Sequence, residues 1–152
     1  MTTQTNDLAI STVARIDSLT ANEFFVEVDG EKIDGIFRVT GLVAFKLDVR
    51  AQSALKALKE PFKITRMVRR DPNDPFNRWL RESTLAKADI VRPTRTVDVV
   101  ANDGGTETRR WSVKRAWISE ISYSDFNTGS GELVEETVTI QYEEIEDIWP
   151  RS

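Results

Sequence analysis

The stretch over residues 94–146 constrains the fold more than any other part of the chain. It contains three runs in which apolar and polar residues alternate, separated by turn signals at residues 102–105 and 129–131. Successive side chains of a strand point to opposite faces of a sheet, so this alternation is typical of strands with one buried face. Clusters of Gly, Asn and Asp favour the tight turns that join antiparallel strands. The last third of the chain is therefore predicted to form an antiparallel meander.

The region before this meander also has the pattern of strands. Residues 24–28 alternate, with Phe24, Val26 and Val28 on one face, and the Asp29-Gly30 pair that follows predicts a hairpin turn. Residues 33–40 are the predicted returning strand, interrupted by Gly35, and Gly41 marks a bend or bulge. These two strands are expected to pair with each other.

Further strands are predicted over residues 43–49 and 62–68. In the first, Val43, Phe45, Leu47 and Val49 alternate with polar or small residues, as in a half-buried strand. Residues 50–60 have helical propensity but are few and end at Pro61, so this segment stays open between a short helix and a loop.

One helix has a clear start signal at Asp74-Pro75. An aspartate at the N-cap accepts hydrogen bonds from the first free amides, and proline suits the first helical position. Four residues then follow at the spacing i, i+3, i+4 and i+7 of one helix face: Phe76, Trp79, Leu80 and Ser83. The pattern predicts a helix of about three turns that buries this face and ends before Pro93.

The fold class predicted from these elements is mainly β, a β-sandwich or barrel-like fold of about eight strands with one short α-helix. We divide the chain into an N-terminal arm over residues 1–22 and a β-sandwich domain over residues 23–152. The arm is polar except for four apolar residues, Leu8, Ile10, Val13 and Ile16. It is interpreted as an extended arm or short helix that needs a partner surface, with a frayed tail as the alternative.

Composition excludes several classes of function. The chain of 152 residues has no cysteine and no histidine, which removes disulfides, thiolate or imidazole metal sites and His-dependent nucleophilic catalysis. A carboxylate-pair or lysine enzyme stays possible in principle, but we expect no enzyme activity and no cofactor. The formal net charge of −4 argues against nucleic-acid binding as the main function. No signal peptide or membrane span is recognisable, so we expect synthesis in the cytoplasm and no direct membrane anchoring.

Three groups of residues were considered as sites. The acidic ending, Glu143, Glu144, Glu146 and Asp147, is interpreted as a solvated face, with partner docking second and a metal site third. Salt bridges or subunit contacts explain Arg66, Arg69 and Arg70 more simply than phosphate binding does. The tryptophans Trp79, Trp111 and Trp117 are assigned to core or subunit packing. No catalytic, cofactor-binding or metal-binding residue is therefore assigned.

A set of residues in fixed order gives the chain a family resemblance. It comprises Trp111, Ala116, Trp117, Glu136, Thr137, Tyr142 and Glu143. Together with the upstream run Phe37-Arg38-Val39-Thr40-Gly41-Leu42, this set resembles the tail-tube proteins of contractile phages and contractile injection systems. These are related in architecture to the ring protein of type VI secretion. The family's usual motifs are altered at residues 69–72 and 114–118, which leaves the contacts between rings undefined.

The resemblance implies a hexameric-ring tube fold and a structural function. The expected partners are further copies of the chain as stacked homo-hexamers, a sheath protein, baseplate or initiator proteins, and effector protein or DNA as cargo in the lumen. The particle would be a phage tail or an extracellular injection particle. A tube initiator or terminator at the baseplate or cap is the alternative within the same machinery. A monomeric β-barrel binding protein is the alternative of another class.

Overall fold

The structure is a computed structural model that describes residues 19–50 and 55–149. Most of the predicted arm, with its four apolar residues, lies outside this part. The elements in chain order are β1 (Phe24–Val28), β2 (Glu31–Ile33), β3 (Ile36–Thr40), β4 (Leu47–Asp48), β5 (Lys56–Ala57), β6 (Phe62–Met67), α2 (Pro75–Leu85), β7 (Arg95–Asp103), β8 (Thr106–Tyr123), β9 (Glu135–Gln141) and β10 (Glu144–Ile148). The described part is thus mainly β with one helix, which confirms the predicted fold class.

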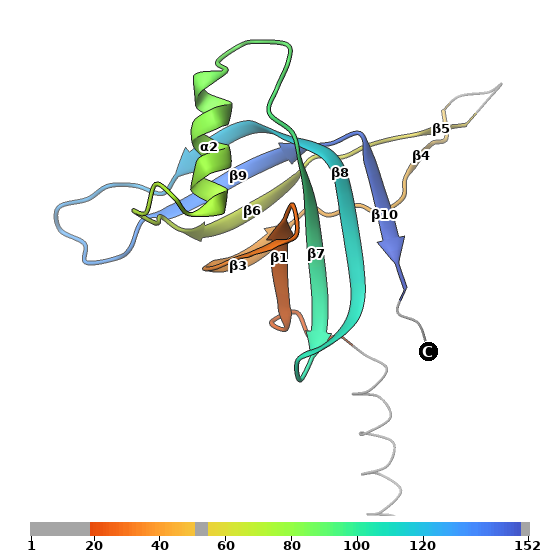
Figure 1. The fold of residues 1–152 in the computed structure, drawn as a ribbon, viewed down its shortest axis with the longest axis horizontal. Coiled ribbons are helices and arrows are strands. Elements are labelled where there is room, and N and C mark those ends of the chain that lie inside the picture. Colours follow the sequence, from red (N-terminus) through yellow and green to blue (C-terminus); the bar gives the residue numbers. More distant parts are fainter. Residues whose placement is uncertain (1–18, 51–54, 150–152) are drawn as a thin grey trace, which may run out of the picture.

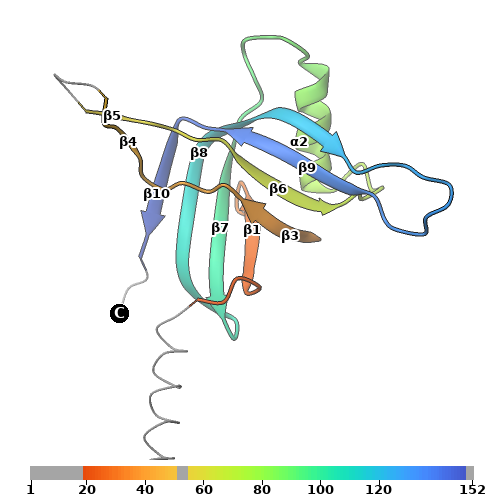
Figure 2. The same ribbon diagram turned by 180° about the vertical axis from the view of Figure 1, so that it is seen from behind.

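The strand β8 joins two sheets into one curved body (Figures 1 and 2). Along the path β2-β1-β7-β8-β9-β6-β3, its first half pairs with β7 and, on the other side, with β10, and its second half pairs with β9. Between the halves, Arg115 has a φ of 52°, and the register against β7 shifts where Arg95 faces Ala116 while Val97 faces Val113. An extra residue of this kind bends a strand and increases its twist. The bulge at Arg115 therefore lets β8 leave one sheet and enter the other.

The core lies between the two sheets and under the helix. Sheet residues at alternate positions supply most of it, and the fully or almost fully buried apolar side chains include Val26, Val28, Val97, Val113, Phe62, Ile64, Ile118, Val138 and Ile140. The helix buries the predicted face, Phe76, Trp79, Leu80 and Ser83. Its start is also confirmed, because the carboxylate of Asp74 accepts a hydrogen bond of 3.0 Å from the amide of Asn77. At its other end the Arg92 guanidinium donates to the carbonyls of Ser83 and Lys87.

The predicted hairpin at Asp29-Gly30 is confirmed only for its first three residue pairs. Both turn residues have positive φ, 50° and 82°, as a tight turn of two residues between right-twisted strands requires. The prediction of one returning strand over residues 33–40 is wrong. After Ile33 the chain turns and β3 pairs with β6 in the other sheet. Near Gly35 the chain therefore passes from one sheet to the other. Alternation alone does not show this change of sheet.

The predicted half-buried strand over residues 43–49 is also wrong. Only Leu47 and Asp48 are in a strand, and they pair with Ala57 and Lys56 in a hairpin that projects from the body (Figures 1 and 2). The side chains of Phe45 and Val49 are 77% and 81% exposed. Alternation predicted a buried face for them, but Val49 lies in the turn that follows Asp48, and both residues are exposed.

Candidate assembly surfaces

A buried charged cluster fixes the start of α2 against the sheet. Arg66 of β6 is fully buried, and its Nη2 lies 2.9 Å from Asp74 Oδ2 and 2.7 Å from Asn77 Oδ1. On the other side its Nε lies 3.6 Å from Glu136 Oε1 of β9. The guanidinium also covers the Phe76 ring, 4.7 Å from the ring centroid. We call Arg66, Asp74 and Glu136 the buried charged cluster.

The cluster changes the acidity of Asp74. Burial raises the pKa of this carboxyl group, but the hydrogen bonds from Arg66 and the Asn77 amide, and the charges of Arg66 and Arg69, more than offset burial. The pKa of Asp74 is therefore lowered from its ordinary value. Because two carboxylates enclose Arg66, its side chain stabilises the fold and is not available to bind a phosphate. The prediction of a surface salt bridge is therefore wrong for Arg66: its ion pairs are present, but they are buried.

The other predicted site residues lie in three different places. Trp79 is fully buried, and its Nε1 donates a hydrogen bond of 3.0 Å to the carbonyl of Pro93. Trp111 and Trp117 are half-buried on β8. The acidic ending forms β10 and its approach, and Glu143, Glu144 and Glu146 are exposed there. No sequence signal beyond alternation indicated that these acidic residues form a strand.

The acidic side chains near β10 that were considered as metal ligands are paired with basic side chains. Arg115 pairs with Glu143, Arg109 pairs with Asp147, and Lys114 Nζ lies 3.2 Å from Glu146 Oε2. Within residues 19–50 and 55–149, no group of three or more potential metal ligands of the His, Cys, Asp and Glu types comes together. These side chains form a band of ion pairs along the joined strands β8 and β10.

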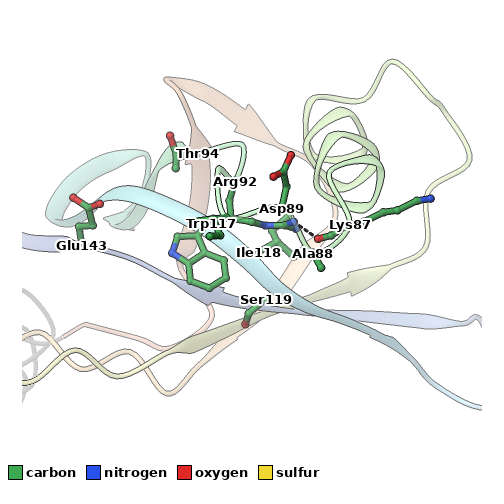
Figure 3. A pocket seen from close by; sticks show the side chains of 10 residues that line it. Lys87, Ala88, Asp89, Arg92, Thr94, Trp117, Ile118, Ser119 and Glu143 are labelled. Carbon is green, nitrogen blue, oxygen red and sulfur yellow. Dashed lines mark hydrogen bonds between the residues drawn. The ribbon is translucent and has the colours of Figure 1, made fainter.

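An open groove of about 550 Å³ lies between the segment after α2 and the bend of β8 (Figure 3). Lys87, Asp89 and Arg92 line one wall, and Trp117 and Glu143 lie on the other. Ile90, which also lines the groove, is 96% exposed. The Arg92 side chain is already used to hold the end of α2, and the charges are mixed. The mixed charges and the exposed Ile90 suit contact with another surface.

The β4–β5 hairpin and the residues that flank it carry several exposed apolar side chains. Phe45, Val49, Leu55 and Leu58 are all exposed along it. Its two described residue pairs are supplemented by a hydrogen bond of 2.8 Å from the Leu58 amide to the Lys46 carbonyl and by a Lys46–Glu60 ion pair of 2.9 Å. Apolar side chains held outward in this way indicate a contact surface.

The sheet has open edges that also suit assembly. β2 and β3 end the strand path, and β10 has only β8 as a neighbour among the described strands. An unpaired edge presents backbone amides and carbonyls that can pair with another chain. As for membranes, no helix of the described residues is long and apolar enough to span one. A curved sheet with open edges and a projecting apolar hairpin defines a structural subunit that works by assembly.

Comparison with known proteins identifies the family. The chain belongs to the family of the T4-like virus tail tube protein gp19, whose model matches residues 20–146. The residues on which the resemblance rested lie inside this match. They include Glu136, which belongs to the buried charged cluster, and Trp117, which lies at the bend of β8. No curated protein matches the sequence.

Solved structures have the same fold at low sequence identity. A chain of the PVC sheath–tube complex, an extracellular contractile injection system in its extended state, has a TM-score of 0.67 and 14% identity. The match covers 92% of this chain and 97% of that one. A chain of the tube-terminating cap of the anti-feeding prophage has a TM-score of 0.69 and 13% identity, and the match covers 88% of this chain and 92% of that one. Hcp1 from Flavobacterium johnsoniae has a TM-score of 0.52 and 13% identity, and the match covers 84% of this chain and 96% of that one.

Proposed function

We propose that this tail tube protein forms hexameric rings that stack into a hollow tube inside a contractile sheath. The observation that carries the proposal is the β4–β5 hairpin, which projects from the body (Figure 1). Its apolar side chains are exposed, so a neighbouring subunit can cover them. A ring uses head-to-tail contacts that close laterally, and stacking uses a second contact that stays open axially. The open edges of the sheet supply the lateral contact in this scheme.

The mechanism is mechanical rather than chemical. The sheets line the lumen and α2 faces the sheath, so main-chain hydrogen bonds run around the tube and stiffen it. Contraction of the sheath then drives the tube as a rigid body through a target envelope. The acidic balance of the chain favours a bore that does not retain nucleic acid. The protein has no enzyme activity in this proposal.

The remaining partners follow from the same scheme. Synthesis takes place in the cytoplasm, a baseplate or initiator protein templates the first ring, and an effector protein or DNA is the cargo in the lumen. The solved relatives are chains of a sheath–tube complex, a cap and a baseplate, which supports a particle of that kind.

A second candidate function is that of a tube terminator or initiator. The similarity to the tube-terminating cap, with a TM-score of 0.69, is as high as the similarity to the sheath–tube complex, at 0.67. The two functions share a fold but differ in copy number. We expect single rings that do not stack from a terminator, and rings that stack from a tube protein.

Negative-stain electron microscopy, with the mass in solution from light scattering, tests the proposal. We expect hexamer-sized rings, and stacked tubes at high concentration or on a baseplate template. Single rings that never stack, even on the template, would favour the terminator. A monomer at every concentration and on the template would contradict both functions.

Deleting residues 1–22 tests the proposed domain division. We propose that the arm controls stacking, so the truncated protein should form rings as before but stack differently. The hydrogen bond from the Asn102 amide to the Glu23 carbonyl is retained in this truncation, so the start of β1 keeps its anchor. Unchanged stacking would reject this function of the arm.

A further inference from the structure

A second cleft, beside the helix, has three arginines at its walls. It lies between α2, the segment that follows β6, and the end of β8, and its volume is about 320 Å³. Arg69 and Arg70 line one side, Arg81 of α2 lines the other, and Val68, Leu80 and Tyr123 contribute apolar surface. We call these six residues the arginine cleft.

The positive charge of this cleft is not neutralised within the described residues. Arg69 Nε lies 3.7 Å from Asp74 Oδ1, but Asp74 is already bound to Arg66. Glu136 also lines the cleft, but it is buried and faces the same Arg66. Arg70 and Arg81 are exposed, and no described carboxylate lies within 4.0 Å of either guanidinium. A chain with a net charge of −4 thus has a local excess of cations here.

The cleft also offers apolar surface next to these cations. The Tyr123 side chain is 52% exposed, and Val68 is exposed beside it. An arginine can bind a carboxylate through two parallel hydrogen bonds, and a neighbouring apolar surface can bury a side chain of the same partner. The chemistry that fits is an acidic segment that carries an aliphatic or aromatic residue.

Two acidic regions of a second copy are poorly suited to this cleft. The loop over residues 124–134 carries Asp125 and Glu132, but it adjoins the cleft in its own copy, where the Val68 amide bonds to the Val134 carbonyl at 2.9 Å. When two adjacent patches meet reciprocally in a pair of copies, the contact has a two-fold axis and closes on itself instead of propagating along a tube. The acidic residues near β10 are already paired with cations.

We infer that the arginine cleft binds an acidic segment of a different protein, with Arg70 and Arg81 as its anion-binding residues. The binding segment holds one apolar side chain against Val68 and Tyr123. That this protein is the sheath rests on the proposed function, in which α2 faces outward. The chemistry of the segment does not depend on that assignment.

The test measures binding of a short fluorescein-labelled peptide that is rich in glutamate and contains one leucine and one phenylalanine. A peptide with glutamine at every glutamate position is the comparison. Fluorescence polarisation is recorded with the full chain and with the double variant Arg70→Glu/Arg81→Glu. The matched control is Lys63→Glu/Lys87→Glu, which makes the same charge change at exposed cations of β6 and of the segment after α2, away from the sheet edges.

We expect the acidic peptide to bind the native chain at least about tenfold more tightly than the glutamine peptide at low salt, since exposed ion pairs are screened at high salt. The cleft variant should lose this preference and the control should retain it. Equal binding of the two peptides, or equal loss in both variants, would overturn the inference.

Electron microscopy of the same variants separates this inference from the proposed function. Rings that form normally in the cleft variant, together with loss of peptide binding, support an acidic segment of another protein. Rings lost only in the cleft variant would identify the cleft as a contact between copies and overturn that occupant. Rings absent from the native chain, with specific peptide binding intact, would reject ring assembly but leave the cleft assignment standing.

Discussion

The buried charged cluster and the β4–β5 hairpin lie near opposite ends of β6, and they place polar and apolar side chains in opposite ways. At one end, Arg66 is fully buried between Asp74 and Glu136. At the other, the hairpin before Phe62 holds Phe45 and Val49 in solvent. In the buried charged cluster, a buried charge fixes one arrangement of helix and sheet. In the hairpin, the apolar groups do not contribute to the core of the subunit and are exposed.

This difference separates the residues needed for folding from those available for assembly. A buried arginine is costly unless its carboxylate partners are correctly placed, so the cluster penalises any other position of α2. A two-stranded hairpin with few residue pairs is only marginally stable alone, and its exposed apolar area adds nothing to the stability of the monomer. Substitutions at the two ends should therefore affect different measurements.

The largest effect on stability is expected for Trp79→Ala. Trp79 is fully buried, lies edge-on to Phe76 with ring centroids 6.0 Å apart, and bonds to the Pro93 carbonyl. Its truncation should lower the free energy of unfolding by about 3–5 kcal/mol. Urea unfolding followed by circular dichroism measures this, with the exposed Val49→Ala as the control. A loss below about 1 kcal/mol would show that the helix contributes little to the core.

The next effect is expected for Asp74→Asn. Asparagine caps helices about as well as aspartate, so this change removes the negative charge and largely retains the cap. Among the described residues, Glu136 is then the one carboxylate left beside Arg66, and we expect a loss of about 2 kcal/mol in the free energy of unfolding. Asp71→Asn is the control, since Asp71 is exposed and its side chain accepts only from the Asn73 amide. Equal losses in the two variants would assign the effect to the turn rather than to the cluster.

Acid should remove the same contribution in the native chain. Because the pKa of Asp74 is lowered in the folded state, its ionisation stabilises the protein above the ordinary pKa of about 4. That stability is lost as the pH falls from there through the lower folded value. The unfolding free energies of the native chain and Asp74→Asn should therefore converge as the pH is lowered from 7 to 3. Curves that stay parallel over this range would exclude Asp74 as the titrating group.

The sequence predicted those features that depend on neighbours along the chain. The cap at Asp74 and the buried face of α2 follow from residues within one or two turns of each other, and both were predicted correctly. The last-third meander was predicted from the alternation of its strands and from the turn residues between them, which lie close together in the sequence. The family resemblance, which rests on spaced residues, supplied the function that local patterns do not.

The features that the sequence did not predict depend on distant partners. Alternation at Phe45 and Val49 predicted a common buried face, but whether a sheet covers such a segment is decided elsewhere in the chain. The burial of Arg66 depends on Asp74 and on Glu136 of a remote strand. The change of sheet within β8 depends on one bulge at Arg115, a residue with no local signal for positive φ. Arg70 and Arg81 come together only because α2 packs beside the end of β6.

The smallest effect on stability, and the sharpest test of the comparison, is expected for Phe45→Ser. The Phe45 side chain is 77% exposed, so its removal should change the free energy of unfolding by less than about 0.5 kcal/mol. Leu85→Ser is a matched control, because Leu85 is equally exposed, at 77%, and ends α2 rather than the hairpin. If the hairpin serves assembly, rings seen by electron microscopy should be lost or weakened only with Phe45→Ser, while urea unfolding of both variants stays native-like. Intact rings in Phe45→Ser would show that the hairpin does not make the subunit contact. The open sheet edges would then be the surfaces that make it. A large loss of stability would instead show that Phe45 packs within its own subunit, and the separation of folding from assembly residues along β6 would fail.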